Sequence, residues 1–105
     1  MTIRINGITW YIIFTDNPYY LKYYDGSIRL GITDTIKKTI YILDGLSGEL
    51  LRKVLLHELT HAWIASYDID LHLQSEEFLC SFVDSFSDDI ISQCDYILQS
   101  PKWIK

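Results

Sequence analysis

Apolar and polar residues follow two different patterns along this chain. Residues 1–45 contain short runs rich in β-branched and aromatic residues, which are typical of strands. From residue 47 onwards, an apolar run at 50–67 indicates a mostly buried helix, and apolar residues that recur at steps of three and four from Phe78 to Leu98 indicate a second, amphipathic helix. The pattern therefore predicts an α+β fold, with a β half at about 1–45 followed by a helical half at about 47–100.

Four runs in the β half are strand candidates. They are Thr2–Ile5, Ile8–Thr15, Ile28–Thr33 and Thr39–Leu43. Asn6-Gly7 between the first two runs predicts a two-residue hairpin turn, or else a bulge within one long strand. The polar pairs Asp34-Thr35 and Lys37-Lys38 predict a second hairpin loop. The aromatic segment Tyr19–Tyr24 is ambiguous between strand and helix. We therefore expect a small antiparallel or mixed sheet.

Two long helices are expected in the helical half. The first begins after Ser47, a residue type that caps helix N-termini, and runs to about Tyr67. The second begins after Ser75 and ends one or two residues before Pro101, because the residue before a proline disfavours helix. The sheet packed on these two helices would make residues 1–105 a single compact domain.

The first helix carries the pattern His57-Glu58-Leu59-Thr60-His61. Histidines four residues apart lie about 40° apart on one helical face, so both imidazoles can bind one metal ion. Glu58 between them can accept a proton from a metal-bound water. The surrounding helix is apolar on most sides, and burying polar side chains is costly unless they have partners. We therefore prefer a metal site to the alternative of three exposed polar residues on a partly buried helix.

A catalytic zinc site needs a third protein ligand and one open position. The candidates that follow the motif are Asp68, Asp70, His72, Glu76 and Glu77. The aspartates come directly after the helix end, so the chain would have to fold straight back, whereas His72 lies in an irregular connection. Glu76 and Glu77 open the second helix, where acidic side chains also complement the helix dipole. The residues alone leave these candidates open.

The HExxH motif with Trp63, and the segment Glu77-Phe78-Leu79-Cys80-Ser81 on the following helix, resemble the gluzincin metallopeptidases. The likeness is to their minimal single-domain forms and to the ImmA/IrrE-like proteins of phages and mobile elements. The resemblance implies that Glu77 is the third zinc ligand, with Glu76 a poorer fit, and that the residue four positions later orients a zinc-bound histidine. Ser81 stands there in place of Asp or Asn, and an uncharged hydroxyl orients an imidazole less strongly.

The function implied by this resemblance is Zn²⁺-dependent hydrolysis of peptide bonds, with Glu58 as general base and a peptide or protein as substrate. In such domains an edge strand binds the extended peptide. SprT-like proteases share an HExxHxW start, matched here through Trp63, and would use His72 as the third ligand. The competing class is a non-catalytic, metal-stabilised protein-binding module. A peptidase kept latent by the tail around Trp103 is a further alternative.

The charge, the absence of a signal pattern and the cysteine spacing limit the kinds of partner, cellular location and cross-link that we expect. The net charge of −5 argues against nucleic acid, because binding phosphates needs a basic surface. We expect no membrane span and, because a secretory signal pattern is missing, a cytoplasmic location (the host cytoplasm for a phage-encoded chain). Cys80 and Cys94 lie fourteen residues apart on one expected helix, too far for a disulfide or a shared metal. Both are expected to face the core.

Overall fold

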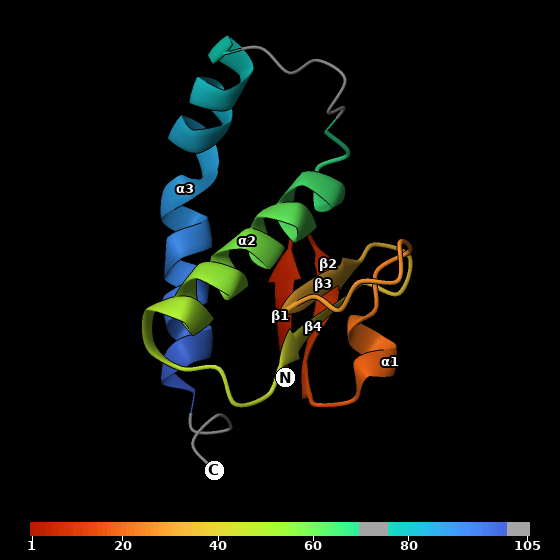
Figure 1. Ribbon diagram of the computed structural model, residues 1–105. Coiled ribbons are helices and arrows are strands. Elements are labelled where there is room, and N and C mark those ends of the chain that lie inside the picture. The colour runs from red at the N-terminus through yellow and green to blue at the C-terminus, as the bar shows by residue number, and fades with distance from the viewer. Residues whose placement is uncertain (70–75, 101–105) are drawn as a thin grey trace.

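In the computed structural model, four strands form a mixed sheet that has helices on both faces (Figure 1). The structure describes residues 1–69 and 76–100, apart from the side chains of residues 76–79 and 84. The strands are β1 (Thr2–Ile5), β2 (Ile8–Thr15), β3 (Gly31–Asp34) and β4 (Thr39–Leu43). The helices are α1 (Pro18–Leu21), α2 (Gly48–Ser66) and α3 (Glu76–Gln99). The α+β class expected from the sequence is confirmed.

The strand order is β1-β2-β4-β3, so β1 and β3 lie at the two edges of the sheet that the described residues form. The β1–β2 and β3–β4 pairs are antiparallel hairpins, whereas β2 and β4 pair in parallel. Parallel neighbours need a crossover connection. Here the connection from β2 to β4 contains α1 and β3. Strand β3 lies beyond β4 at the edge of the sheet, and the chain then turns back into β4.

The predicted hairpin at Asn6-Gly7 is confirmed, and the alternative of one long bulged strand is wrong. Both turn residues have positive φ, at 50° and 76°, which is the conformation that a two-residue type I′ turn requires. The Asn6 side chain also donates a hydrogen bond to the backbone oxygen of Ser66 at 3.0 Å. The turn is therefore held against the C-terminal end of α2.

The second hairpin also forms, but its first strand begins later than Ile28–Thr33. Strand β3 starts at Gly31 and includes Asp34, which we had expected in the loop. Ile28 pairs with Lys22, and Arg29 N donates to Leu21 O at 2.8 Å, so residues 28 and 29 pair with the chain at the end of α1 instead of extending β3. The tyrosine-rich segment opens with the short helix α1, which Asn17 caps by accepting a hydrogen bond from Tyr19 N at 3.0 Å and which begins at Pro18.

Helix α2 has the bounds that the apolar pattern predicted, to within one residue. Ser47 is its N-cap, although the serine side chain makes no capping hydrogen bond, and Tyr67 is its C-cap. Helix α3 ends at Gln99 as expected, and the predicted cap Ser75 lies outside the described residues. In the described part of the chain, no helix has both the length and the apolar character needed to cross a membrane.

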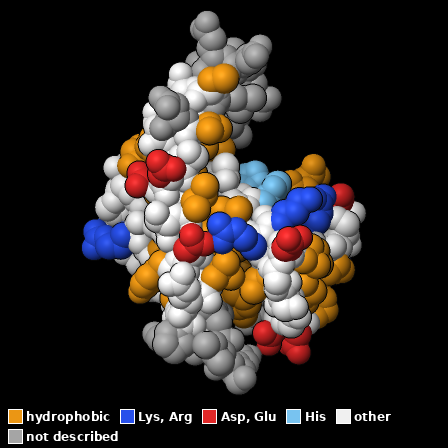
Figure 2. Space-filling model, turned by 90° about the vertical axis from the view of Figure 1, so that its left-hand side faces the viewer, with side chains coloured by type: hydrophobic (Ala, Val, Ile, Leu, Met, Phe, Trp, Pro, Cys, Tyr) orange, Lys and Arg blue, Asp and Glu red, His pale blue; other side chains and the backbone are white. Residues whose placement is uncertain are grey.

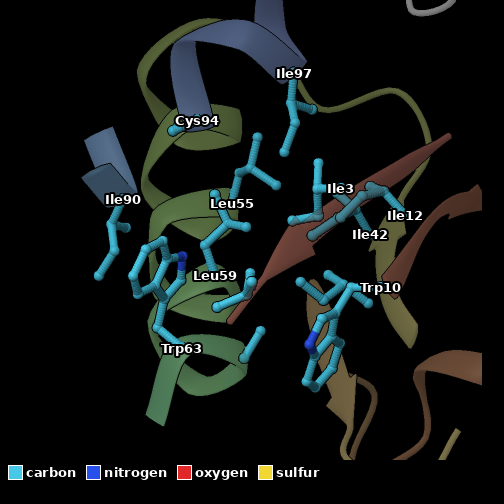
Figure 3. Close-up of a cluster of buried hydrophobic side chains, with 13 residues drawn as sticks. Ile3, Trp10, Ile12, Ile42, Leu55, Leu59, Trp63, Ile90, Cys94 and Ile97 are labelled. Atoms are coloured by element: carbon cyan, nitrogen blue, oxygen red, sulfur yellow. The ribbon is translucent and has the colours of Figure 1, made fainter. Parts of the chain in front are cut away.

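The core lies between one face of the sheet and the helices α2 and α3 (Figure 3). The sheet contributes Ile3, Ile5, Trp10, Ile12, Ile40 and Ile42. Helix α2 contributes Leu55, Leu59, Ala62 and Trp63, and helix α3 contributes Ile90, Cys94 and Ile97. All of these residues are at most 7% exposed. Full burial of one large apolar side chain contributes about 1.5–3 kcal/mol, so this layer supplies a large share of the driving force for folding.

Polar contacts hold α2 in one position on the sheet and against α3. Trp10 Nε1 donates to Ser66 Oγ at 2.8 Å, which is a buried hydrogen bond between β2 and the end of α2. Trp63 Nε1 donates to Gln93 Oε1 at 2.9 Å, and Arg52 forms an ion pair with Asp95. Contacts to both neighbours therefore fix the position of the helix that carries the HExxH motif.

The expectation that both cysteines face the core is wrong for Cys80, which is exposed, and correct for Cys94. Figure 1 shows the reason, since the first turns of α3 extend beyond the sheet and α2. Burial also raises the pKa of the Cys94 thiol, which lowers its thiolate fraction.

We therefore expect one thiol per native chain to react rapidly with Ellman's reagent, and two after unfolding in guanidinium chloride. The rapid reaction should disappear in Cys80→Ser and persist in Cys94→Ser. Two rapidly reacting thiols in the native wild type would contradict the packing of α3 on the sheet.

Candidate metal centre

The two histidines of the motif lie on the exposed side of α2, and Figure 2 shows histidine side chains at the surface. Their Nε2 atoms are 3.2 Å apart, and the ring planes are inclined at 73°. Two nitrogen ligands at about 2.05 Å from a tetrahedral Zn²⁺ are separated by about 3.3 Å. The separation of the His57 and His61 Nε2 atoms is therefore close to that of two ligands on one such ion.

Glu58 lies between the histidines in the sequence, but its side chain turns toward the sheet and is buried, at 7% exposed. The Thr33 hydroxyl is 2.9 Å from Glu58 Oε1 and 3.1 Å from the Glu58 backbone oxygen. A hydroxyl has one proton, so it donates to one of these oxygens at a time. No hydrogen bond to Oε2 is found among the residues that the structure describes.

Gly31 allows β3 to approach α2 closely enough for this contact. A Cβ atom placed on Gly31 would lie 2.8 Å from Val54 Cγ1 and 2.9 Å from Glu58 Cγ, which are distances shorter than van der Waals contact. A residue without a side chain is needed at position 31 because side chains of α2 occupy the space that a Cβ atom would take. Any side chain here would push α2 away from β3, and with it Glu58 away from Thr33.

A cleft runs between α2 and β3. One cavity of about 320 Å³ is lined by His57, Glu58 and His61 from the helix and by Gly31 and Thr33 from the strand. A second cavity of about 300 Å³ shares His57, Glu58 and Gly31 and continues along α2 toward Lys53. The motif residues therefore line one continuous cleft along the edge strand, where a bound molecule would contact both elements.

The structure brings together His57, Glu58 and His61, as the motif predicted. The backbone of Glu76 and Glu77 lies in the first turn of α3, but their side chains lie outside the part that the structure describes. Ser81 is on the same helix and is exposed. The roles of Glu77 as third ligand and of Ser81 as an orienting group stay predictions.

Of the other candidate ligands, only Asp68 belongs to the part of the chain that the structure describes. Asp70 and His72 lie outside the described residues, as does the tail around Trp103. Asp68 is exposed and follows the end of α2 with a φ of 52°. Within residues 1–69 and the described side chains of α3, no group of three or more His, Cys, Asp or Glu side chains is arranged to hold a metal ion.

Gly31 and Thr33 are the site residues that sequence reasoning missed. A glycine within a strand-like run is a known signal of close backbone approach, so Gly31 offered a clue. Thr33 offered none, because threonine is an ordinary strand residue. Its role follows from contact with Glu58, which is twenty-five residues away in the sequence.

No family model matches this chain, and no curated protein or solved structure matches it either. The likeness to gluzincins consequently rests on the HExxH motif, on the residues near it and on the order of the elements.

Replacing Gly31 with alanine should destabilise the fold by about 1–3 kcal/mol, because the new methyl group overpacks the contact between β3 and α2. Urea unfolding followed by circular dichroism measures this change. The double variant Gly31→Ala/Val54→Ala should lose less stability than the sum of the two single variants, since it removes the Cγ1 atom that the new methyl group meets. Wild-type stability in Gly31→Ala would show that β3 and α2 are not in close contact.

Proposed function

We propose that this protein is a zinc-dependent metallopeptidase-like domain in which His57, His61 and Glu77 bind Zn²⁺ and Glu58 is the general base. The observation that carries the proposal is the 3.2 Å separation of the two histidine Nε2 atoms, in a cleft that also holds the buried carboxylate of Glu58. Imidazole and carboxylate ligands suit zinc. Hydrolysis by an activated water needs metal ligands and a general base that face the same space, and His57, His61 and Glu58 line one cavity.

The residues of the chain divide the chemistry among them. When bound, Zn²⁺ supplies Lewis acidity and makes a water molecule acidic near neutral pH. Glu58 accepts the proton of the attacking water at Oε2, while the Thr33 hydroxyl holds Oε1 and fixes the direction of the carboxylate. Glu58 then gives the proton to the leaving amine, so that one carboxylate serves first as base and then as acid.

Strand β3 supports the choice of an extended peptide as substrate. Leu43 N donates to Leu30 O at 2.8 Å, and the direction of peptide groups alternates along an antiparallel strand. The peptide groups of Gly31 and Thr33 therefore point away from β4, toward the open edge. An added peptide strand can form backbone hydrogen bonds with these groups and would then lie beside the histidines.

Elemental analysis of the purified protein tests the metal site. We expect about one zinc per wild-type chain, loss of zinc in His57→Ala and in Glu77→Ala, and retention of zinc in His72→Ala, because a catalytic site uses three protein ligands. Loss of zinc in His72→Ala instead of Glu77→Ala would support a three-histidine, SprT-like site. Failure of the wild type to bind added zinc would contradict the proposal and leave the two imidazoles joined by a hydrogen bond.

Cleavage of a peptide library separates a catalytic site from a structural one. The wild type loaded with zinc should cleave peptides, and Glu58→Gln should bind zinc equally well but cleave none, because an amide accepts no proton. Zinc binding by a wild type that cleaves nothing would favour the non-catalytic binding module.

Thr33→Val tests whether the hydroxyl holds Glu58. Valine has the shape of threonine but cannot donate, so kcat/KM should fall by about 10–100-fold while the zinc content stays the same. Thr33→Ser retains the hydroxyl and should keep most of the activity. Unchanged kcat/KM in Thr33→Val would show that the direction of the carboxylate is set by another contact.

A further inference from the structure

A second hollow lies on the other side of β3 from the metal-binding cleft. Its cavity volume is about 460 Å³, and five of the eight tyrosines of the chain line it. They are Tyr19, Tyr20, Tyr23, Tyr24 and Tyr41. We call this hollow the tyrosine groove; Lys22 and Lys37 lie at its border. It shares Tyr23 and Ile32 with the cavity at the histidines, so the two hollows adjoin at β3.

The side chains of β3 divide between these two hollows. Gly31 and Thr33 face α2, as their distances to Glu58 show, whereas Ile32 and Asp34 line the tyrosine groove. A peptide added to the open edge follows the same pleat and directs alternate side chains to the two faces. One set would enter the cleft beside the histidines, and the other set would enter the tyrosine groove.

Ring contacts hold the walls of the groove in place. Tyr20 stacks on Tyr41 of strand β4, with centroids 5.1 Å apart and planes inclined at 17°. The guanidinium of Arg29 lies 4.3 Å from the ring centroid of Tyr23. These two contacts hold Tyr20, Tyr41 and Tyr23 within the chain, so binding beside them costs less ordering of side chains than binding at the more exposed Tyr19 and Tyr24.

The charge of this edge is opposite to that of the whole chain. Lys22 and Lys37 are exposed at the tyrosine groove, and Lys53 lines the continuation of the metal-binding cleft. Asp34 is the acidic residue that lines the groove, and its carboxylate already accepts hydrogen bonds from two backbone amides of its own turn. Figure 2 shows basic side chains beside the histidines, with acidic side chains next to them. A chain with a net charge of −5 thus presents lysines along its open strand.

We propose that the β3 edge selects extended peptides with acidic side chains at alternate positions. Lys22, Lys37 and the tyrosine hydroxyls would bind these carboxylates in the tyrosine groove, while the intervening residues face the histidines. Lysine and phenol groups donate hydrogen bonds, and a carboxylate accepts them. The inference rests on the proposed function for cleavage of the peptide, but its binding step needs neither metal nor turnover.

Fluorescence anisotropy with Glu58→Gln, which prevents turnover, measures the binding step. The probes are labelled peptides with Glu, Gln or Lys at alternate positions, tested both with zinc and with a chelator, so that direct binding of a carboxylate to the metal is separated out. We expect the Glu peptide to bind about tenfold more tightly than the Gln peptide in both conditions, and less tightly as salt is added. A Glu peptide with proline between the acidic positions should bind poorly, because proline removes the donors of an added strand.

Charge variants locate the contact. In the Glu58→Gln background, the double substitution Lys22→Glu/Lys37→Glu should abolish the preference for the Glu peptide. The milder Lys22→Gln/Lys37→Gln should reduce that preference. Arg4→Glu, an exposed charge change on the opposite edge strand, should leave it unchanged. Equal binding of the Glu and Gln peptides, no binding of either, or the same loss in Arg4→Glu would overturn the inference. If the acidic peptide binds but the wild type does not cleave it, the peptidase proposal is contradicted and the charge selection is supported. If peptides are cleaved without a preference for acidic side chains, the peptidase proposal is supported and the charge selection is contradicted.

Discussion

The close approach of α2 to β3 at Gly31 is the contact on which the candidate site depends. Without a Cβ atom at this position, the strand comes near enough for the Thr33 hydroxyl to reach the carboxylate of Glu58. The same approach forms the cleft in which the histidines lie. One missing methyl group therefore sets the direction of the candidate base, the width of the cleft and the distance from the histidines to the open strand.

Neighbouring positions on α2 have opposite environments, and this difference separates their roles. His57 and His61 are exposed, whereas Glu58 is 7% exposed. Burying a carboxylate is costly unless it is hydrogen-bonded, and the donor comes from β3. The proposed metal ligands are thus accessible from solvent, while the base lies deeper in the same cleft with one carboxylate oxygen hydrogen-bonded to β3.

Local sequence patterns predicted most helices, strands and turns, whereas the start of β3 and the role of Thr33 depend on contacts between residues far apart in the sequence. The bounds of α2 followed from its apolar residues, and the Asn6-Gly7 turn followed from the φ values that such residues tolerate. The start of β3 was wrong because the preceding chain pairs with the end of α1, and no local preference reports that competition. The motif likewise predicted His57, Glu58 and His61 as a group, but not Thr33, whose role exists only once β3 and α2 meet.

The parallel pairing of β2 with β4 explains why an open strand lies beside the motif. In a sequential meander β3 would lie between β2 and β4, with partners on both sides. Parallel pairing instead makes the crossover carry α1 and β3 around β4, so β3 returns as an edge strand next to α2. The same crossover brings the tyrosines of residues 19–24 to the far side of β3. The parallel pairing of β2 with β4 therefore leaves β3 as an edge strand, with the metal-binding cleft on one face of it and the tyrosine groove on the other.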